Sequence, residues 1–176
     1  MDRRTFGTSM LLGAFGVAAA PAVAQGRRRP MAGMMPMGPA EMRHVRETLQ
    51  IGAVALQSSE LALDRASDDD VRRFATAEVD EQRGVAMILR EISGMAPPPP
   101  GPADRAALQR LQGARGEAFE RDYIAAQLDG HDRLLRVQDQ YLAQGRNQHH
   151  RHIAMLAASR IREHIADLRD LRDDAR

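Results

Sequence analysis

The fold of this chain is limited most by long, proline-free stretches in which apolar residues recur at steps of three and four. Such spacing places apolar side chains on one face of an α-helix, whereas a half-buried strand needs alternation at every second residue. No stretch of useful length in the sequence alternates in that way. The pattern therefore predicts an all-α protein.

Breaks in this pattern separate four long helices and one short helix. The run from Pro97 to Pro102 is a stiff extended connector, because consecutive prolines remove backbone donors. Ser67, with Asp70 three residues later, has the form of a capping box, so we expect it to cap the second helix. The expected helices cover residues 40–66, 67–92, 104–112, 117–143 and 148–171.

Long helices of similar length joined mainly by short turns predict an antiparallel four-helix bundle in residues 40–176. A domain of about 150 residues can bury close to 70% of its unfolded surface, so it can form a real core. The chain has no cysteine, which excludes disulfides and thiolate metal sites. Its stability must therefore come from packing.

The N-terminus has the features of an export signal. The pair Arg3-Arg4 is followed by a glycine- and alanine-rich apolar run and by Ala22-Val23-Ala24, a small-x-small cleavage site. The apolar run is shorter than the roughly 20 residues that a membrane span needs. We therefore expect residues 1–24 to be a twin-arginine-type signal peptide, the mature protein to be periplasmic, and no integral span to remain.

Residues 25–39 are rich in Met, Pro and Gly and have no period, so we expect a flexible leader. Thioether sulfur is a soft ligand that suits Cu(I), which gives the leader one functional interpretation. A linker whose methionines are incidental or scavenge oxidants is the favoured alternative. The methionines concerned are Met31, Met34, Met35, Met37 and Met42.

Charge and motifs exclude several classes of function. The 25 basic residues are all arginine and stand against 24 acidic ones, and removal of residues 1–24 leaves a formally neutral chain. Nucleic acid is thereby excluded as the main partner, because phosphate binding needs a clustered positive excess. The sequence has no glycine-rich phosphate loop and no His-Glu-x-x-His motif, so no enzyme class is predicted. Nothing in it identifies a partner protein or an oligomeric state.

Several polar residues fall on the predicted apolar stripes, where burial is costly unless they are paired or bind a metal. They are Glu60 on the first long helix, Glu78 and Gln82 on the second, Glu120, His131 and Gln138 on the third, and His164 at the edge of the fourth.

Two interpretations of these residues stay open. A buried Glu–His network that sets helix register is favoured, because the Glu-x-x-His spacing of di-iron bundles is missing and Gln82 is a poor ligand. The alternative is an iron, copper or zinc site formed by Glu60, Glu78, His131 and His164. Proton-transfer catalysis ranks third. In either of the first two cases, a Glu60 carboxylate oxygen should lie within about 4 Å of a ring nitrogen of His131 or His164.

The fourth long helix opens with His149, His150 and His152. These histidines could chelate a metal or sense pH. A solvated helix start is favoured, because no acidic or sulfur ligand lies nearby in the sequence.

Three segments carry a resemblance to a known family: Val71–Ala75, Phe119–Ile124 with the downstream His131, and Ile161–Ile165. Over residues 41–171 the chain resembles the domain of unknown function family 4142, and Glu60 matches a glutamate common in its first helix. The resemblance implies an exported, ferritin-like bundle. Family members usually carry Asp-His where this chain has Glu81-Gln82, which weakens a metal site inferred by analogy.

The sequence thus predicts an exported periplasmic bundle, non-enzymatic, acting in envelope stress or binding, with an interior Glu–His network. The alternative is a ferritin-like protein that binds a transition metal through the same residues.

Overall fold

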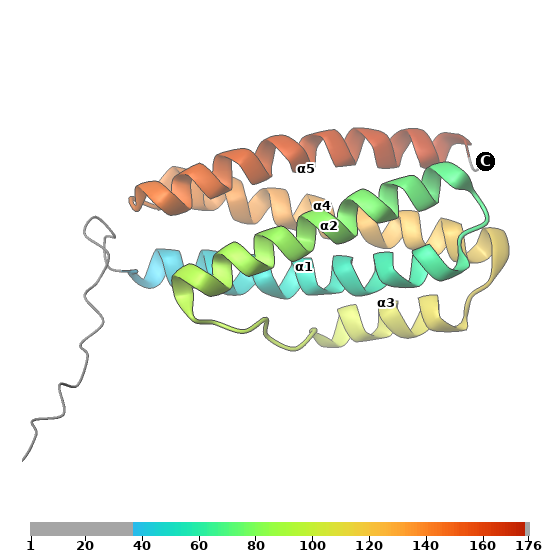
Figure 1. The fold of residues 1–176 in the computed structure, drawn as a ribbon, viewed down its shortest axis with the longest axis horizontal. Coiled ribbons are helices and arrows are strands. Elements are labelled where there is room, and N and C mark those ends of the chain that lie inside the picture. The colour runs from blue at the N-terminus through green and yellow to red at the C-terminus, as the bar shows by residue number, and fades with distance from the viewer. Residues whose placement is uncertain (1–36, 175–176) are drawn as a thin grey trace, which may run out of the picture. The chain divides into compact units, whose positions relative to one another are not determined.

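The computed structural model describes residues 37–174, and within that range the chain is all α-helix with no strand. The five helices are α1 (Pro39–Arg65), α2 (Asp69–Ser93), α3 (Pro102–Gly113), α4 (Gly116–Gln144) and α5 (Gln148–Asp174) (Figure 1). The all-α prediction is confirmed, and each helix lies within three residues of its expected bounds. The predicted signal peptide and most of the predicted leader lie outside the described residues.

The four long helices lie side by side, and the short α3 lies along them (Figure 1). α1 contacts α2 and α4, α4 contacts α5, and α2 meets α5, so these four helices surround a common interior. α3 packs against α1 and α4. Turns of three residues, 66–68 and 145–147, reverse the chain between neighbouring helices. This arrangement brings side chains from α2, α4 and α5 together although they are distant in sequence.

The N-cap of α2 is Asp68, so the prediction of Ser67 was wrong by one residue. The Asp68 carboxylate accepts hydrogen bonds from the backbone N–H groups of Asp70 and Val71, at 2.7 and 3.0 Å. The preceding backbone is tied to α4, because Ser67 N and Asp68 N both donate to Glu120 Oε1. Glu120 therefore fixes the start of α2 and does not contribute to the interior.

The buried face of α1 is formed largely by small residues, among them Ala55, Ser59 and Ala62. Leu63 on α1 and Leu156 on α5 both follow the three- and four-residue apolar spacing and were therefore expected to face inward, yet they are 39% and 75% exposed. Small side chains let neighbouring helices approach closely, so the centre of the buried face need not coincide with the largest apolar residues. Glu60, which lies near Leu63 on α1, is therefore exposed as well.

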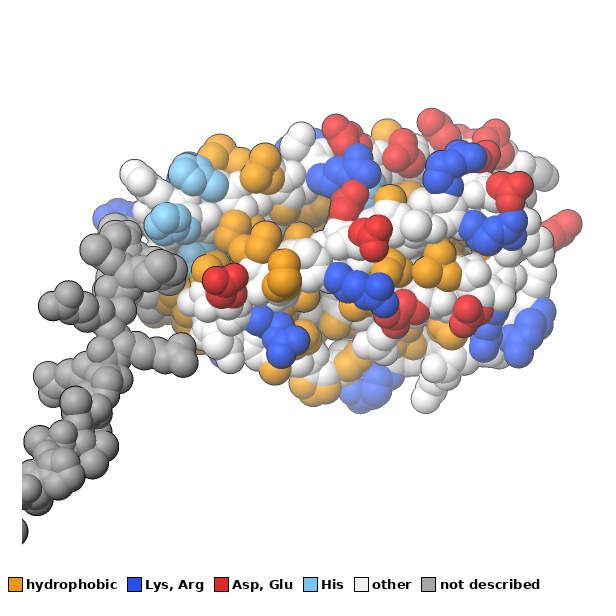
Figure 2. All heavy atoms as spheres, in the orientation of Figure 1, with side chains coloured by type: hydrophobic (Ala, Val, Ile, Leu, Met, Phe, Trp, Pro, Cys, Tyr) orange, Lys and Arg blue, Asp and Glu red, His pale blue; other side chains and the backbone are white. Residues whose placement is uncertain are grey.

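The core consists of three apolar clusters along the bundle. One contains Phe74, Phe119 and Tyr123, a second is centred on Ile51, Leu134 and Ile161, and the third contains Val45, Leu49 and Leu89. Full burial of such side chains stabilises the fold by about 1.5–3 kcal/mol each. On the face drawn in Figure 2, arginines and acidic residues are interspersed. Among residues 37–174 no helix has the length and apolar character to cross a membrane.

Candidate metal centre

Three of the four predicted ligand residues meet in the interior of the bundle. Glu78 comes from α2, His131 from α4 and His164 from α5, and their exposed fractions are 0%, 0% and 2%. The structure therefore contains a buried Glu/His network. We refer to these three residues as the Glu78 cluster.

One atom of each side chain in the Glu78 cluster points to a common centre. Glu78 Oε2 lies 3.0 Å from His164 Nδ1 and 3.4 Å from His131 Nε2, and these two nitrogens are 3.1 Å apart. Ligand atoms around a tetrahedral ion with bonds of about 2.0–2.1 Å are separated by about 3.3 Å. The three atoms thus have the mutual spacing of a metal ligand set, and the cluster could hold a metal.

The hydrogen bonds around the cluster orient its atoms. His131 Nδ1 donates to the carbonyl oxygen of Gln127 at 2.8 Å, so Nε2 of a neutral His131 presents a lone pair to the centre. Gln82 Nε2 donates to Glu78 Oε1 at 3.0 Å, which engages one carboxylate oxygen and leaves the other to the centre. Oε2 accepts no well-aligned hydrogen bond from the described part of the chain.

The electrostatics of the cluster favour a cation at its centre. Burial alone would raise the pKa of Glu78, but the adjacent imidazoles of His131 and His164 outweigh it and lower this pKa to about 2. Burial would lower the pKa of His131, but contact with Glu78 reverses this and raises it. A carboxylate is therefore held ionised in the interior, where it needs a proton on an imidazole or a metal ion as its counter-charge.

Apolar and charged neighbours complete the surroundings. The Phe74 ring packs at 5.0 Å from His164 and 6.0 Å from His131, measured between ring centroids. On the outer side, His164 Nε2 lies 3.4 Å from Glu81 Oε2, and Glu81 is paired with Arg160 at 2.7 Å. Glu81 therefore lies between the buried cluster and the surface.

Glu60, the fourth predicted residue, is not part of the cluster, and the expected Glu60–histidine contact is wrong. Glu60 is exposed and accepts a hydrogen bond from Arg83 at 2.8 Å. The buried position beside it belongs to Ser59, whose hydroxyl is 2.9 Å from Tyr123 OH. The apolar spacing placed Glu60 on the same helix face as Leu56 and Leu63, whereas the buried Ser59 lies about 100° away around the helix.

The sequence interpretation missed a second polar group at the end of the bundle where α1 and α5 begin. His44 and Tyr141 stack with ring centroids 4.4 Å apart, and Tyr141 OH donates to Glu41 Oε1 at 2.9 Å. His150 is 2% exposed, so the expectation of a wholly solvated histidine run at the start of α5 is wrong for this residue. His149 and His152 are exposed, and Figure 2 shows histidine at the surface at that end.

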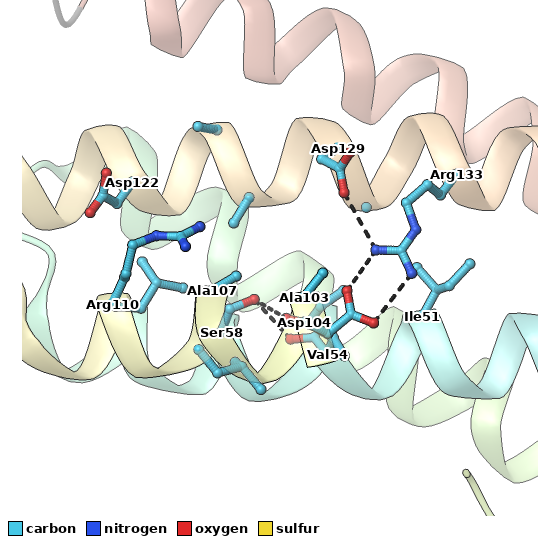
Figure 3. Close-up of a pocket in the computed structure, with 16 residues that line it drawn as sticks. Ile51, Val54, Ser58, Ala103, Asp104, Ala107, Arg110, Asp122, Asp129 and Arg133 are labelled. Carbon is cyan, nitrogen blue, oxygen red and sulfur yellow. Dashed lines mark hydrogen bonds and ion pairs between the residues drawn. The ribbon is translucent and has the colours of Figure 1, made fainter. Parts of the chain in front are cut away.

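A separate pocket of about 280 Å³ lies between α1, α3 and α4 (Figure 3). Its wall is rich in alanine, and Asp104 on α3 forms an ion pair of 2.6 Å with Arg133 on α4. Figure 3 shows Arg133 reaching both Asp104 and Asp129. The Asp104–Arg133 ion pair ties α3 to α4. The residues that line this pocket include no histidine.

Comparisons with known proteins agree with this architecture. No curated protein matches the chain. A crystal structure described as a "putative secreted protein DUF305" from Streptomyces coelicolor has 18% sequence identity and a TM-score of 0.69, covering 77% of this chain and 92% of that one. At this identity the likeness shows a shared fold. The profile of the domain of unknown function DUF4142 matches residues 27–171. The chain therefore belongs to the DUF4142 family.

Proposed function

We propose that this protein is a metal-binding helical bundle that holds one divalent first-row transition metal at Glu78, His131 and His164. The observation that carries the proposal is the mutual spacing of the three ligand atoms, 3.0, 3.1 and 3.4 Å. The carboxylate–imidazole composition supports Fe²⁺ or Zn²⁺, because two histidines and one carboxylate form known sites for both.

The surroundings of the cluster support this role. A ligating imidazole usually donates its second ring N–H to a carbonyl or carboxylate, as His131 does to Gln127 O. Gln82 takes no ligand position and instead orients Glu78. The histidine that family members carry at that position is thus replaced by a supporting residue, and three protein ligands remain.

Burial favours holding an ion over acting on a large substrate. All three ligand residues are at most 2% exposed, and Phe74 packs against both imidazoles. We therefore infer a non-enzymatic role, in which the bundle stores or carries the ion. The ferritin-like character implied by the family resemblance is consistent with this role.

The second candidate function is a structural network without metal. It is favoured by the direct contact of His131 Nε2 with His164 Nδ1, which one proton can bridge. In that case the ionised Glu78 and a protonated imidazole would form a buried pair that fixes the register of α2, α4 and α5.

Metal analysis of the full chain, purified without a histidine tag, tests the proposal. We expect about one equivalent of iron or zinc in the wild type and loss of that equivalent in His131→Gln. The matched control is His152→Gln, whose exposed side chain should leave the metal content unchanged. A folded wild-type protein that neither contains these metals nor takes them up on titration would leave the structural network as the function.

We further propose that the protein is exported to the periplasm, with residues 1–24 as a twin-arginine-type signal peptide. The Arg3-Arg4 pair and the Ala22-Val23-Ala24 site support this, as does the fold shared with a protein described as secreted. N-terminal sequencing of the protein recovered from the periplasm should give Gln25 first. Replacement of Arg3 and Arg4 by lysine should abolish export, and unchanged export would contradict the twin-arginine route.

A further inference from the structure

The second polar group lies away from the Glu78 cluster and contains two buried histidines on different helices. His44 is on α1, His150 is on α5, and each is 2% exposed. Within residues 37–174, neither His44 Nδ1 nor His150 Nδ1 has a hydrogen-bond partner, and both atoms are buried. A buried polar atom without a partner costs about 1–3 kcal/mol, so two of them in one place require an explanation.

The tautomer of His44 follows from its neighbours. Gln138 Nε2 donates to Thr48 Oγ1 at 3.1 Å, which orients the amide so that Oε1 faces His44. His44 Nε2 is 2.7 Å from that oxygen and must donate to it. Nδ1 of a neutral His44 is therefore a lone pair, which is the form that binds a metal.

The two rings have a separation suited to a shared ion. Their centroids are 5.8 Å apart and the planes are nearly perpendicular, at 73°. Two imidazoles that bind one ion through single nitrogens, with bonds of about 2.0–2.1 Å, have centroids about 5 Å apart at a tetrahedral angle and about 6.5 Å apart in a linear arrangement, so the observed separation lies between the two. In the Glu78 cluster the corresponding separation of His131 and His164 is 5.2 Å.

The charge around this pair suits a monovalent ion. Burial lowers the pKa of both His44 and His150, so both are neutral near pH 7. Glu41 is the acidic group that interacts with both, and its two oxygens are already engaged by Gly38 N and Tyr141 OH, at 2.9 Å each. Glu41 therefore supplies one negative charge but no free ligand atom. A single negative charge balances a monovalent ion better than a divalent one.

We propose that His44 and His150 form a second metal site, which binds one Cu⁺ ion through their Nδ1 atoms. Imidazole binds copper, and Cu⁺ carries the single positive charge that Glu41 can balance. A groove of about 320 Å³ between α1 and α4, lined by His44 and Tyr141, offers a path from the surface. The site is independent of the Glu78 cluster.

Anaerobic titration of the full chain with Cu⁺, in competition with a chromophoric Cu⁺ chelator, tests the proposal. We expect the tight equivalent to be lost, with at least a 100-fold drop in affinity, in His44→Gln and in His150→Gln. The matched controls are His149→Gln and His152→Gln, exposed histidines of the same helix start, which should retain it. The variant Glu78→Gln/His131→Gln should also retain it, which separates this site from the proposed function.

Two results would overturn the proposal. Loss of Cu⁺ binding in His149→Gln or His152→Gln, with His44→Gln unaffected, would identify surface chelation by the helix start. Unchanged binding in both His44→Gln and His150→Gln would place the copper elsewhere. Because either variant could unfold, the wild type is also followed by ¹⁵N NMR of its histidine rings, where Cu⁺ should shift the Nδ1 resonances of His44 and His150 and leave those of His149 and His152 in place.

Discussion

His131 Nε2 lies 3.1 Å from His164 Nδ1, joining α4 to α5 in the interior of the bundle. Because Gln127 takes the proton of His131 Nδ1, this contact must contain either a shared proton or a metal ion. Glu78 Oε2 faces the same centre.

The substitution Glu78→Gln should destabilise the metal-free protein by about 3–5 kcal/mol, because it removes one partner of a buried charge pair. It should also remove the bound divalent metal. Urea unfolding measures the first effect. The control is Glu60→Gln, on the exposed Glu60–Arg83 pair, which should cost about 0–1 kcal/mol. Equal costs for the two variants would mean that Glu78 is not paired in the folded protein.

Stability of the metal-free protein should be greatest between about pH 5 and 6.5. The pKa of Glu78 is lowered from 4.5 to about 2, so its contribution is complete above the unfolded value and is lost as the pH falls toward 2. The pKa of His131 is raised above 6.5, so its contribution is complete below 6.5 and is lost as the pH rises through the folded value. Urea midpoints of unfolding, measured from pH 3 to pH 9, test both losses of stability. In Glu78→Gln the midpoint should depend less on pH.

On the alkaline side, metal affinity should rise with pH, whereas the stability of the metal-free protein should fall. A metal ion displaces the proton of His131, so affinity for Zn²⁺ should rise as the pH increases through the raised pKa of His131. Competition titrations at pH 6, 7 and 8 measure this dependence. An affinity that is constant over this range would indicate that no ligand loses a proton on binding.

Replacement of Glu81 by glutamine should weaken metal binding by about 10–100-fold without abolishing it, because Glu81 supports the outer nitrogen of His164. The matched control is Glu163→Gln. Glu163 also pairs with Arg160, at 2.8 Å, but within residues 37–174 the carboxylates that lie beside His164 are those of Glu78 and Glu81. If both variants bind metal equally well, Glu81 acts only as a surface partner of Arg160.

The substitution Asp68→Ala should cost about 1 kcal/mol in unfolding free energy, because it removes the side-chain cap of α2. Ser67→Ala should have little effect, since the backbone N–H of Ser67, and not its side chain, donates to Glu120. Urea unfolding of both variants distinguishes the two positions. A larger cost for Ser67→Ala than for Asp68→Ala would indicate that Ser67 caps α2, as the sequence pattern predicted.

Periodicity predicted the helices well because their bounds depend on local features, namely the apolar spacing, the proline run and the glycines. It also identified Glu78, His131 and His164, since each is a polar residue on a face otherwise composed of apolar side chains. Glu60 was misplaced because the buried face of α1 near it carries the small residues Ala55, Ser59 and Ala62, whereas the large Leu63 is exposed.

The His44 and His150 group could not be found in the same way. His150 lies in a histidine run that looks solvated, and its burial depends on how α5 packs against Tyr141 and His44. The hydrogen bond of His44 to Gln138 joins residues on α1 and α4. A single sequence carries no signal for such a pairing, although Gln138 on the apolar face of α4 was a partial indication.

The most direct test of the account is a crystal structure of the full chain loaded with Zn²⁺, with data collected on both sides of the zinc absorption edge. We expect an anomalous peak about 2.0–2.1 Å from Glu78 Oε2, His131 Nε2 and His164 Nδ1. A crystal with zinc bound only elsewhere, in which these three atoms keep their direct contacts of 3.0–3.4 Å, would contradict it.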